Sequence, residues 1–260
     1  MKKKVIYALN VLIVAFTLLG LGVMVSNHGD GGLLSSSGWE NLKYFTVLSN
    51  LFCGIVATVF LARGIAGGKG KKEPGPKGEK EPGPKGEKEP GPKGEKEPGP
   101  KGEKEPGPKG EKEPGPKGEK EPGLGMMRAK LMAATAVAVT FLMIAGFFGP
   151  IYGWLPLYQG SNLEFHLIVP VFAMIEICLL EGPLPFSSAV MAGVPALVYG
   201  CVYLGNILIN GKGEWPDTND WYGFMNWGFG IAMVIFGMVV AVSFAVACLL
   251  RFINSKVCKR

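Results

Sequence analysis

Long runs of apolar residues recur along this chain of 260 residues, and polar or charged positions bound each run. A helix needs about 20 mostly apolar residues to cross the hydrocarbon core of a bilayer. Six segments meet or approach that length, at residues 5–25, 44–61, 131–149, 165–180, 186–208 and 224–252. The pattern therefore predicts an all-α integral membrane protein with a six-helix transmembrane bundle. The first run is expected to be a spanning helix rather than a cleaved secretory signal, because it is long and no A-x-A site follows it.

Lysine and arginine are distributed unequally around the predicted helices. With the N-terminus inside, only Lys43 and Lys212 flank the outer ends, whereas eleven basic residues flank the inner ends. These eleven are Lys2, Lys3, Lys4, Arg63, Lys69, Arg128, Lys130, Arg251, Lys256, Lys259 and Arg260. Such an excess predicts that both termini are cytoplasmic and that the protein is a multi-pass protein of the plasma membrane. All five tryptophans fall at the predicted outer ends, where indole rings favour the membrane interface.

A repeat separates the second and third predicted helices. The octad Glu-Pro-Gly-Pro-Lys-Gly-Glu-Lys recurs six times from Glu73 to Lys120, with glycine spacings that alternate between three and five. A collagen triple helix needs glycine at every third position, so this spacing excludes it. Balanced charge without large apolar side chains predicts a disordered cytoplasmic loop at residues 64–127, between membrane parts at 1–63 and 128–260. The repeat is either a spacer or docking tail for an unknown cytoplasmic partner, or a tandem expansion in a tolerant loop.

The charge of the chain is concentrated in this repeat. Residues 71–123 hold 14 of the 27 basic and 13 of the 21 acidic side chains. No basic patch alternates with aromatic residues elsewhere, so the basic balance does not indicate nucleic-acid binding. The five cysteines include no C-x-x-C spacing, and no nucleotide-binding or metalloprotease motif is present. We therefore predict no metal, no cofactor and no disulfide framework.

Polar residues inside the predicted helices are the functional candidates, because burying them in a bilayer is costly. On the second helix, Thr46, Ser49, Asn50 and Cys53 recur at helical spacing and share one face. Asn206, near the outer end of the fifth helix, is predicted to join the same outer layer. The predicted polar groups thus converge in the outer half of the bundle.

The fourth predicted helix carries an intramembrane histidine. Asn162 and Pro170 lie one turn either side of His166, and Pro170 has no N–H to donate to the carbonyl of His166. A kink beside His166 predicts a small polar pocket, because a freed carbonyl is tolerated only where it lines protein or a wet cavity. Glu176 lies about 15 Å deeper along the same helix, too far to orient His166 directly. Its side chain is a protonated hydrogen-bond donor, a partner of groups on the fifth helix, or part of a proton path.

These residues carry a resemblance to a known family. The segment Lys43-Tyr44-Phe45-Thr46 with Ser49-Asn50, and Asn162-x-x-x-His166 with Pro170 and Glu176, resemble the androgen-induced protein family and its bacterial six-span relatives. The resemblance covers all six predicted spans but not the repeat, and the segment at 215–221 does not look like the family. Eukaryotic members are threonine hydrolases that cleave fatty acid esters of hydroxy fatty acids. The resemblance implies a fatty acyl ester of the membrane as substrate, Thr46 as nucleophile and His166 as base.

The implied chemistry is consistent with these side chains. An imidazole is well suited to remove a proton from a hydroxyl near neutral pH, so His166 would activate Thr46. Asn50 or Asn206 would stabilise the oxyanion, and Asn162 is the best candidate to orient His166.

Other interpretations stay open. The hydroxyl of Thr46 could simply donate to a backbone carbonyl of its own helix, as threonine in a membrane helix commonly does. His166, Asn50 and Glu176 could serve only as links between helices. A small proton or solute transporter that uses Glu176 is the main alternative function. A non-catalytic membrane scaffold whose repeat recruits partners is the third.

Overall fold

The computed structural model describes residues 2–26, 38–69, 123–182, 184–214 and 218–258. The repeat and its predicted disorder lie outside the described residues, as do Trp215, Lys259 and Arg260. Every regular element in the described part is helical, and no strand occurs there.

The elements follow one another as fourteen helical segments. In chain order they are α1 Lys2–Ser26, η1 Gly38–Lys43, α2 Phe45–Lys69, α3 Leu124–Met143, η2 Ile144–Phe148, α4 Gly149–Tyr152, η3 Leu155–Tyr158, α5 Ser161–Leu163, η4 Glu164–Ile168, α6 Val169–Leu179, α7 Phe186–Ala192, α8 Val194–Asn210, η5 Phe224–Trp227 and α9 Phe229–Val257. The segments η2 and η4 are π-helical, whereas η1, η3 and η5 are 3₁₀ helices.

In the described part of the chain these segments join into six continuous helices, which we call rods, as the apolar pattern predicts. Each is long and apolar enough to cross a membrane: Lys2–Ser26, Phe45–Ile65, Leu124–Tyr152, Ser161–Leu179, Phe186–Asn210 and Phe229–Val257. Several ends differ from the prediction: α9 covers Phe229–Val257 rather than 224–252, and two helices extend further, because α2 continues to Lys69 and α3 already begins at Leu124. Both extensions run into the 64–127 segment that the sequence assigns to the loop. The helical flanks of the loop are therefore longer than the apolar windows indicate.

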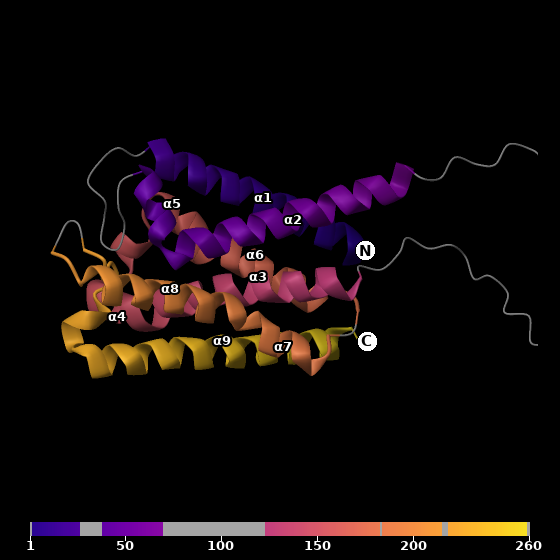
Figure 1. Cartoon of the computed structure of the whole chain (residues 1–260). Coiled ribbons are helices and arrows are strands. Elements are labelled where there is room, and N and C mark those ends of the chain that lie inside the picture. The colour runs from indigo at the N-terminus through magenta and orange to yellow at the C-terminus, as the bar shows by residue number, and fades with distance from the viewer. Residues whose placement is uncertain (1, 27–37, 70–122, 183, 215–217, 259–260) are drawn as a thin grey trace, which may run out of the picture.

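The rods alternate in direction, so the bundle has two distinct ends. Figure 1 shows the N- and C-terminal ends together with the last turns of α2 and the first turns of α3, and we call this the terminal end. The opposite end, which we call the loop end, holds η1, η3 and the segment at 218–228. The described tryptophans, Trp39, Trp154, Trp221 and Trp227, all belong to connections at the loop end.

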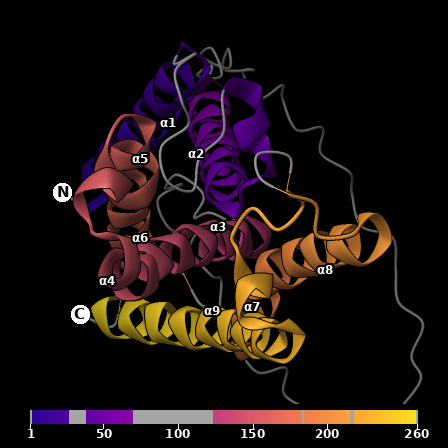
Figure 2. The ribbon, with the colours of Figure 1, turned by 90° about the vertical axis from the view of Figure 1, so that its left-hand side faces the viewer.

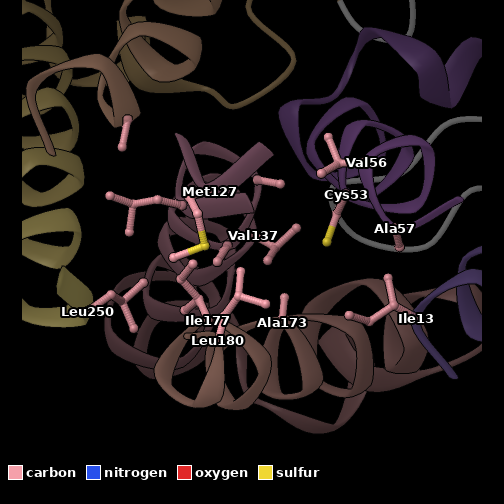
Figure 3. Packing of buried hydrophobic residues seen from close by; sticks show 14 of the residues in the cluster. Ile13, Cys53, Val56, Ala57, Met127, Val137, Ala173, Ile177, Leu180 and Leu250 are labelled. Atoms are coloured by element: carbon pink, nitrogen blue, oxygen red, sulfur yellow. The ribbon is translucent and has the colours of Figure 1, made fainter. Parts of the chain in front are cut away.

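Helix α3 is the centre of the bundle. About 61% of its most apolar window is buried, against 22% for α9, and α3 packs against α2, α6, α7 and α9. Figure 2 shows α3 between the pair α1 and α2 on one side and α7, α8 and α9 on the other. The side chains in Figure 3, among them Ile13, Ala57, Val137 and Ile177, fill the space around it. This core fixes the relative positions of the rods that carry the site.

Small residues allow close approach where the site segments meet the rest of the bundle. At Gly20 of α1 a Cβ atom would lie 2.6 Å from the ring of Phe165 in η4. At Gly54 of α2 it would lie 2.9 Å from Thr17 of α1. Such contacts between small residues and large side chains are typical of membrane helix packing. They hold α1 directly against both α2 and η4.

Candidate functional site

A cavity of about 450 Å³ lies toward the loop end, between α2, α3, η4, α8 and α9. Its walls are largely apolar, with polar groups at one side from the segment at 159–162. Both Thr46 and His166 line this cavity. A mostly apolar pocket with a few convergent polar groups is the usual form of a small-molecule site.

Thr46 lies in the first turn of α2 and is half-buried. Its backbone carbonyl accepts hydrogen bonds from Ser49 Oγ at 3.0 Å and from Asn50 Nδ2 at 2.7 Å. Within the described part of the chain, the Thr46 hydroxyl itself has no hydrogen-bond partner. The hydroxyl therefore does not bond its own helix, as threonine in a membrane helix commonly does.

Asn50 links the two segments that carry the candidate pair. Its Nδ2 donates to the carbonyl of Thr46 at 2.7 Å and to the carbonyl of Phe165 at 3.0 Å, and the side chain is fully buried. One amide thus joins the start of α2 to the residue next to His166. Both amide hydrogens are used in this bridge, and Asn50 does not line the cavity. The geometry therefore corrects the oxyanion role expected for Asn50.

His166 is held by a backbone carbonyl. Its ring is 5% exposed, and Nδ1 lies 2.6 Å from the carbonyl oxygen of Leu157 in η3. A carbonyl oxygen only accepts, so Nδ1 carries the hydrogen and Nε2 of the neutral ring keeps its lone pair. The orienting group is thus the carbonyl of Leu157 and not the side chain of Asn162, which lines the cavity.

Both π-helical segments border the cavity. Ile144 and Phe148 of η2 line it from one side, and Phe165 and His166 of η4 line it from another. A proline follows each segment within two residues, which agrees with the helix irregularity that Pro170 predicts. Single-turn π segments occur frequently at functional sites, because they re-aim side chains within a helix.

A group of tyrosines forms the wall toward the loop end. Tyr199 donates to the carbonyl of Lys43 at 2.6 Å and accepts from Trp221 Nε1 at 2.9 Å. The hydroxyl of Tyr222 accepts the backbone N–H of Phe45 at 2.8 Å. Burial raises the pKa of Tyr222 well above its ordinary value, so its hydroxyl stays protonated at neutral pH. These bonds tie α8 and the 218–228 segment to the start of α2, beside Thr46.

Ser49 and Asn206 lie outside the cavity. Ser49 is buried, and its Oγ lies 3.3 Å from Thr140 Oγ1 on α3. Asn206 donates to Asn219 at 3.0 Å and accepts from Asn210 at 2.7 Å. Asn206 therefore stabilises the end of α8 and is not placed to bind an oxyanion in the cavity.

Glu176 belongs to a separate buried cluster near the terminal end. Both its carboxylate oxygens lie 2.9 Å from Nζ of Lys130 on α3, and Oε1 accepts from Asn10 Nδ2 of α1 at 2.7 Å. Lys130 also donates to Oδ1 of Asn10. The three side chains are 3% exposed or less. A charge pair with such complete hydrogen bonding links α1, α3 and α6.

This cluster bears on two expectations. The sequence places Lys130 among the residues at the inner edge, whereas the structure buries its ammonium group against Glu176. Of the three roles left open for Glu176, a bond to groups on the fifth helix is not the one found, because its partners lie on α1 and α3. Asn10 and Lys130 are thus two buried polar residues that the sequence did not single out as candidates. An asparagine within an otherwise apolar run was the available signal for Asn10.

The fold and the cavity define a class: an all-helical bundle with six helices able to cross a membrane and a largely apolar cavity near one end. Comparison with known proteins finds no matching family, no similar curated protein and no similar solved structure.

Proposed function

We propose that this protein is a membrane-embedded hydrolase of lipid esters, with Thr46 as nucleophile and His166 as general base. The observation that carries the proposal is that both side chains line one cavity of about 450 Å³ between the rods. A resemblance to the androgen-induced protein family supports the same two roles. Fatty acyl esters are the substrate class that this resemblance implies.

Two features of the geometry support a working pair. The bridge through Asn50 joins the backbone at Thr46 to that at Phe165, which fixes the two segments relative to each other. The carbonyl of Leu157 sets the tautomer of His166 that leaves Nε2 able to accept a proton. An oriented base and a hydroxyl nucleophile at one cavity are the groups that acyl transfer requires.

The proposed reaction proceeds in two steps. Oγ of Thr46 attacks the ester carbonyl carbon while Nε2 of His166 takes the hydroxyl proton. The bond from that carbon to the alkoxy oxygen then breaks, and His166 returns the proton to the departing alcohol. Water attacks the acyl-threonine with His166 again as base, which releases the carboxylic acid and restores Thr46. The amide of Asn162, which lines the cavity, is the donor we propose for the oxyanion.

The transport alternative has less support. The buried cluster of Lys130, Glu176 and Asn10 is closed on itself, and none of the three lines the cavity. A path for ions or solutes would need this cluster to open toward water.

We also propose that the terminal end faces the cytoplasm and that the plasma membrane is the location. With Lys130 removed from the count because it is buried, ten basic residues still flank the inner ends against two at the outer ends. The cavity would then open in the outer leaflet, where membrane lipids are the substrates within reach. A disordered repeat with a cytoplasmic partner remains part of this proposal.

Hydrolysis assays on the purified protein in lipid nanodiscs test the proposal. Wild type and Thr58→Ala should cleave fluorogenic acyl esters, whereas Thr46→Ala and His166→Ala should lose at least about a hundredfold in rate. Thr58 is the matched control, because it lies on the same helix, is exposed and bonds the carbonyl of Gly54. Equal rates in wild type, Thr46→Ala and His166→Ala would refute the proposed function.

A further inference from the structure

The cavity extends further from Thr46 toward the loop end than toward the terminal end. Contacts of α3, α8 and α9 show where it ends on the terminal side, which we call its inner limit. On α3, Thr140 lies beside Ser49, which is three residues along α2 from Thr46 toward the terminal end. Val139 and Thr140 are the lining residues of α3 that lie nearest that end. The cavity therefore reaches only about one helical turn, or about 5 Å, beyond Thr46 in this direction.

The contacts of α8 place its side of the cavity at the same level. Tyr199 bonds the carbonyl of Lys43 at 2.6 Å, and its ring lies 5.1 Å from that of Phe45, so it stands beside the start of α2. Only Ala196 lines the cavity further toward the terminal end on this helix. Ala196 precedes Tyr199 by one turn, which matches the inner limit on α3.

On helix α9 the cavity ends at the same level. Phe236 packs on Gly200, where a Cβ atom would lie 1.7 Å from its ring, so Phe236 stands level with Gly200. Val239 is the lining residue of α9 nearest the terminal end, one turn beyond Phe236. Val139, Ala196 and Val239 thus mark the inner limit of the cavity, which we call the floor; Thr140 lies beside them, and none of these four residues is charged.

The other side of the cavity is longer and partly polar. Along α8 the lining continues from Tyr199 to Ile207, a rise of about 12 Å toward the loop end. The polar segment at 159–162 lines this side. Water and a departing alcohol can pass here without crossing the floor. The lining at the floor, by contrast, is apolar except for Thr140.

We propose, on the basis of the proposed function, that the floor binds the acyl group and the longer arm binds the alcohol. The substrates are then esters of short acyl groups with long apolar alcohols, and the acyl group is shorter than the fatty acyl chain that the family resemblance implies. In the acyl-threonine intermediate the acyl group stays in place while the alcohol leaves and water enters. Only the arm toward the loop end provides that exchange. A space of about 5 Å holds about four carbon atoms of an extended chain, because carbon–carbon bonds are about 1.5 Å long.

Two isomeric esters test this assignment in nanodiscs. Decyl acetate and ethyl decanoate have the same formula and differ only in the side of the ester that carries the long chain. Decyl acetate should be cleaved with a kcat/KM at least about tenfold higher, and both rates should vanish in Thr46→Ala. Ethyl decanoate cleaved equally well or faster by the wild type, in a Thr46-dependent way, overturns the inference and leaves the proposed function intact. Hydrolysis of neither ester overturns both.

Variants of the floor provide the second measurement. Val239→Ala should extend the accepted acyl chain by about two carbons, and Ala196→Leu should restrict it to acetate. Ile207→Ala is the matched control, because Ile207 lines the longer arm and should change the preference for the alcohol but not for the acyl group. If Ala196→Leu fails to fold, Val239→Ala alone decides the question. An acyl-length profile that Val239→Ala leaves unchanged overturns the assignment of the floor.

Discussion

Removing Lys130 should destabilise the bundle strongly, because its ammonium group is the only cation that contacts Glu176 in the described part of the chain. The substitution Lys130→Met keeps most of the side-chain volume and leaves the carboxylate of Glu176 with Asn10 as its sole hydrogen-bond donor. Both residues of the pair are 3% exposed or less, so water cannot replace the lost partner.

The magnitude follows from the geometry. Two charges 2.9 Å apart attract by about 6 kcal/mol at an effective dielectric constant of about 20. Loss of one partner of a buried pair costs about 3–5 kcal/mol. We therefore expect Lys130→Met to lower the free energy of unfolding by about 4 kcal/mol at pH 7.

A double variant separates the charge effect from packing. Lys130→Met combined with Glu176→Gln removes both charges, and the glutamine amide can still accept from and donate to Asn10. The free energy of unfolding of this variant should lie within about 1 kcal/mol of that of wild type. Reversible unfolding in mixed detergent micelles, followed by tryptophan fluorescence, measures all three proteins. A double variant as unstable as Lys130→Met, or Lys130→Met as stable as wild type, would contradict this account of the cluster.

Three further predictions concern the cavity and its surroundings. Asn50→Leu removes the side-chain donor from both bridged carbonyls and should cost about 1–3 kcal/mol in the same unfolding assay; no loss would show that the bridge does not hold the two segments. Gly200→Ala places a Cβ atom 1.7 Å from the ring of Phe236 and should cost about 1–3 kcal/mol, whereas Gly205→Ala, with no atom within 4 Å, should change stability little. Because burial raises the pKa of Tyr222 above 10.0, the folded protein holds this proton more tightly. The stability that the raised pKa of Tyr222 contributes is complete below about pH 10 and is lost as the pH rises further. Tyr222→Phe should therefore flatten the fall in melting temperature at alkaline pH.

The six rods could be predicted from the sequence because length and apolar composition alone decide whether a helix can cross a membrane. The same criterion missed the ends of α2 and α3, where polar residues continue a helix beyond the apolar window. Lys130 shows the consequence. It lies near the first turns of α3, so it resembles a flanking charge, and its partner Glu176 is remote in sequence.

The candidate pair could be predicted in part. Helical phase and the resemblance indicated Thr46 and His166, and the structure has both at one cavity. The group that orients His166 could not be found, because the carbonyl of Leu157 is a backbone atom that every residue type provides. Asn50 lies on the predicted face of α2, and its bond to the carbonyl of Phe165 matches the alternative that it links two helices. Which acceptor an amide meets depends on a neighbouring rod, and local spacing does not encode that contact.

The most direct test of the central claim is to map the site of covalent modification by a fluorophosphonate probe in the purified protein. Mass spectrometry should find the adduct on Thr46 in wild type and in Thr58→Ala, and His166→Ala should abolish it, because the hydroxyl then has no base beside it. An adduct on another residue, or an adduct on Thr46 that forms equally fast without His166, would contradict the account.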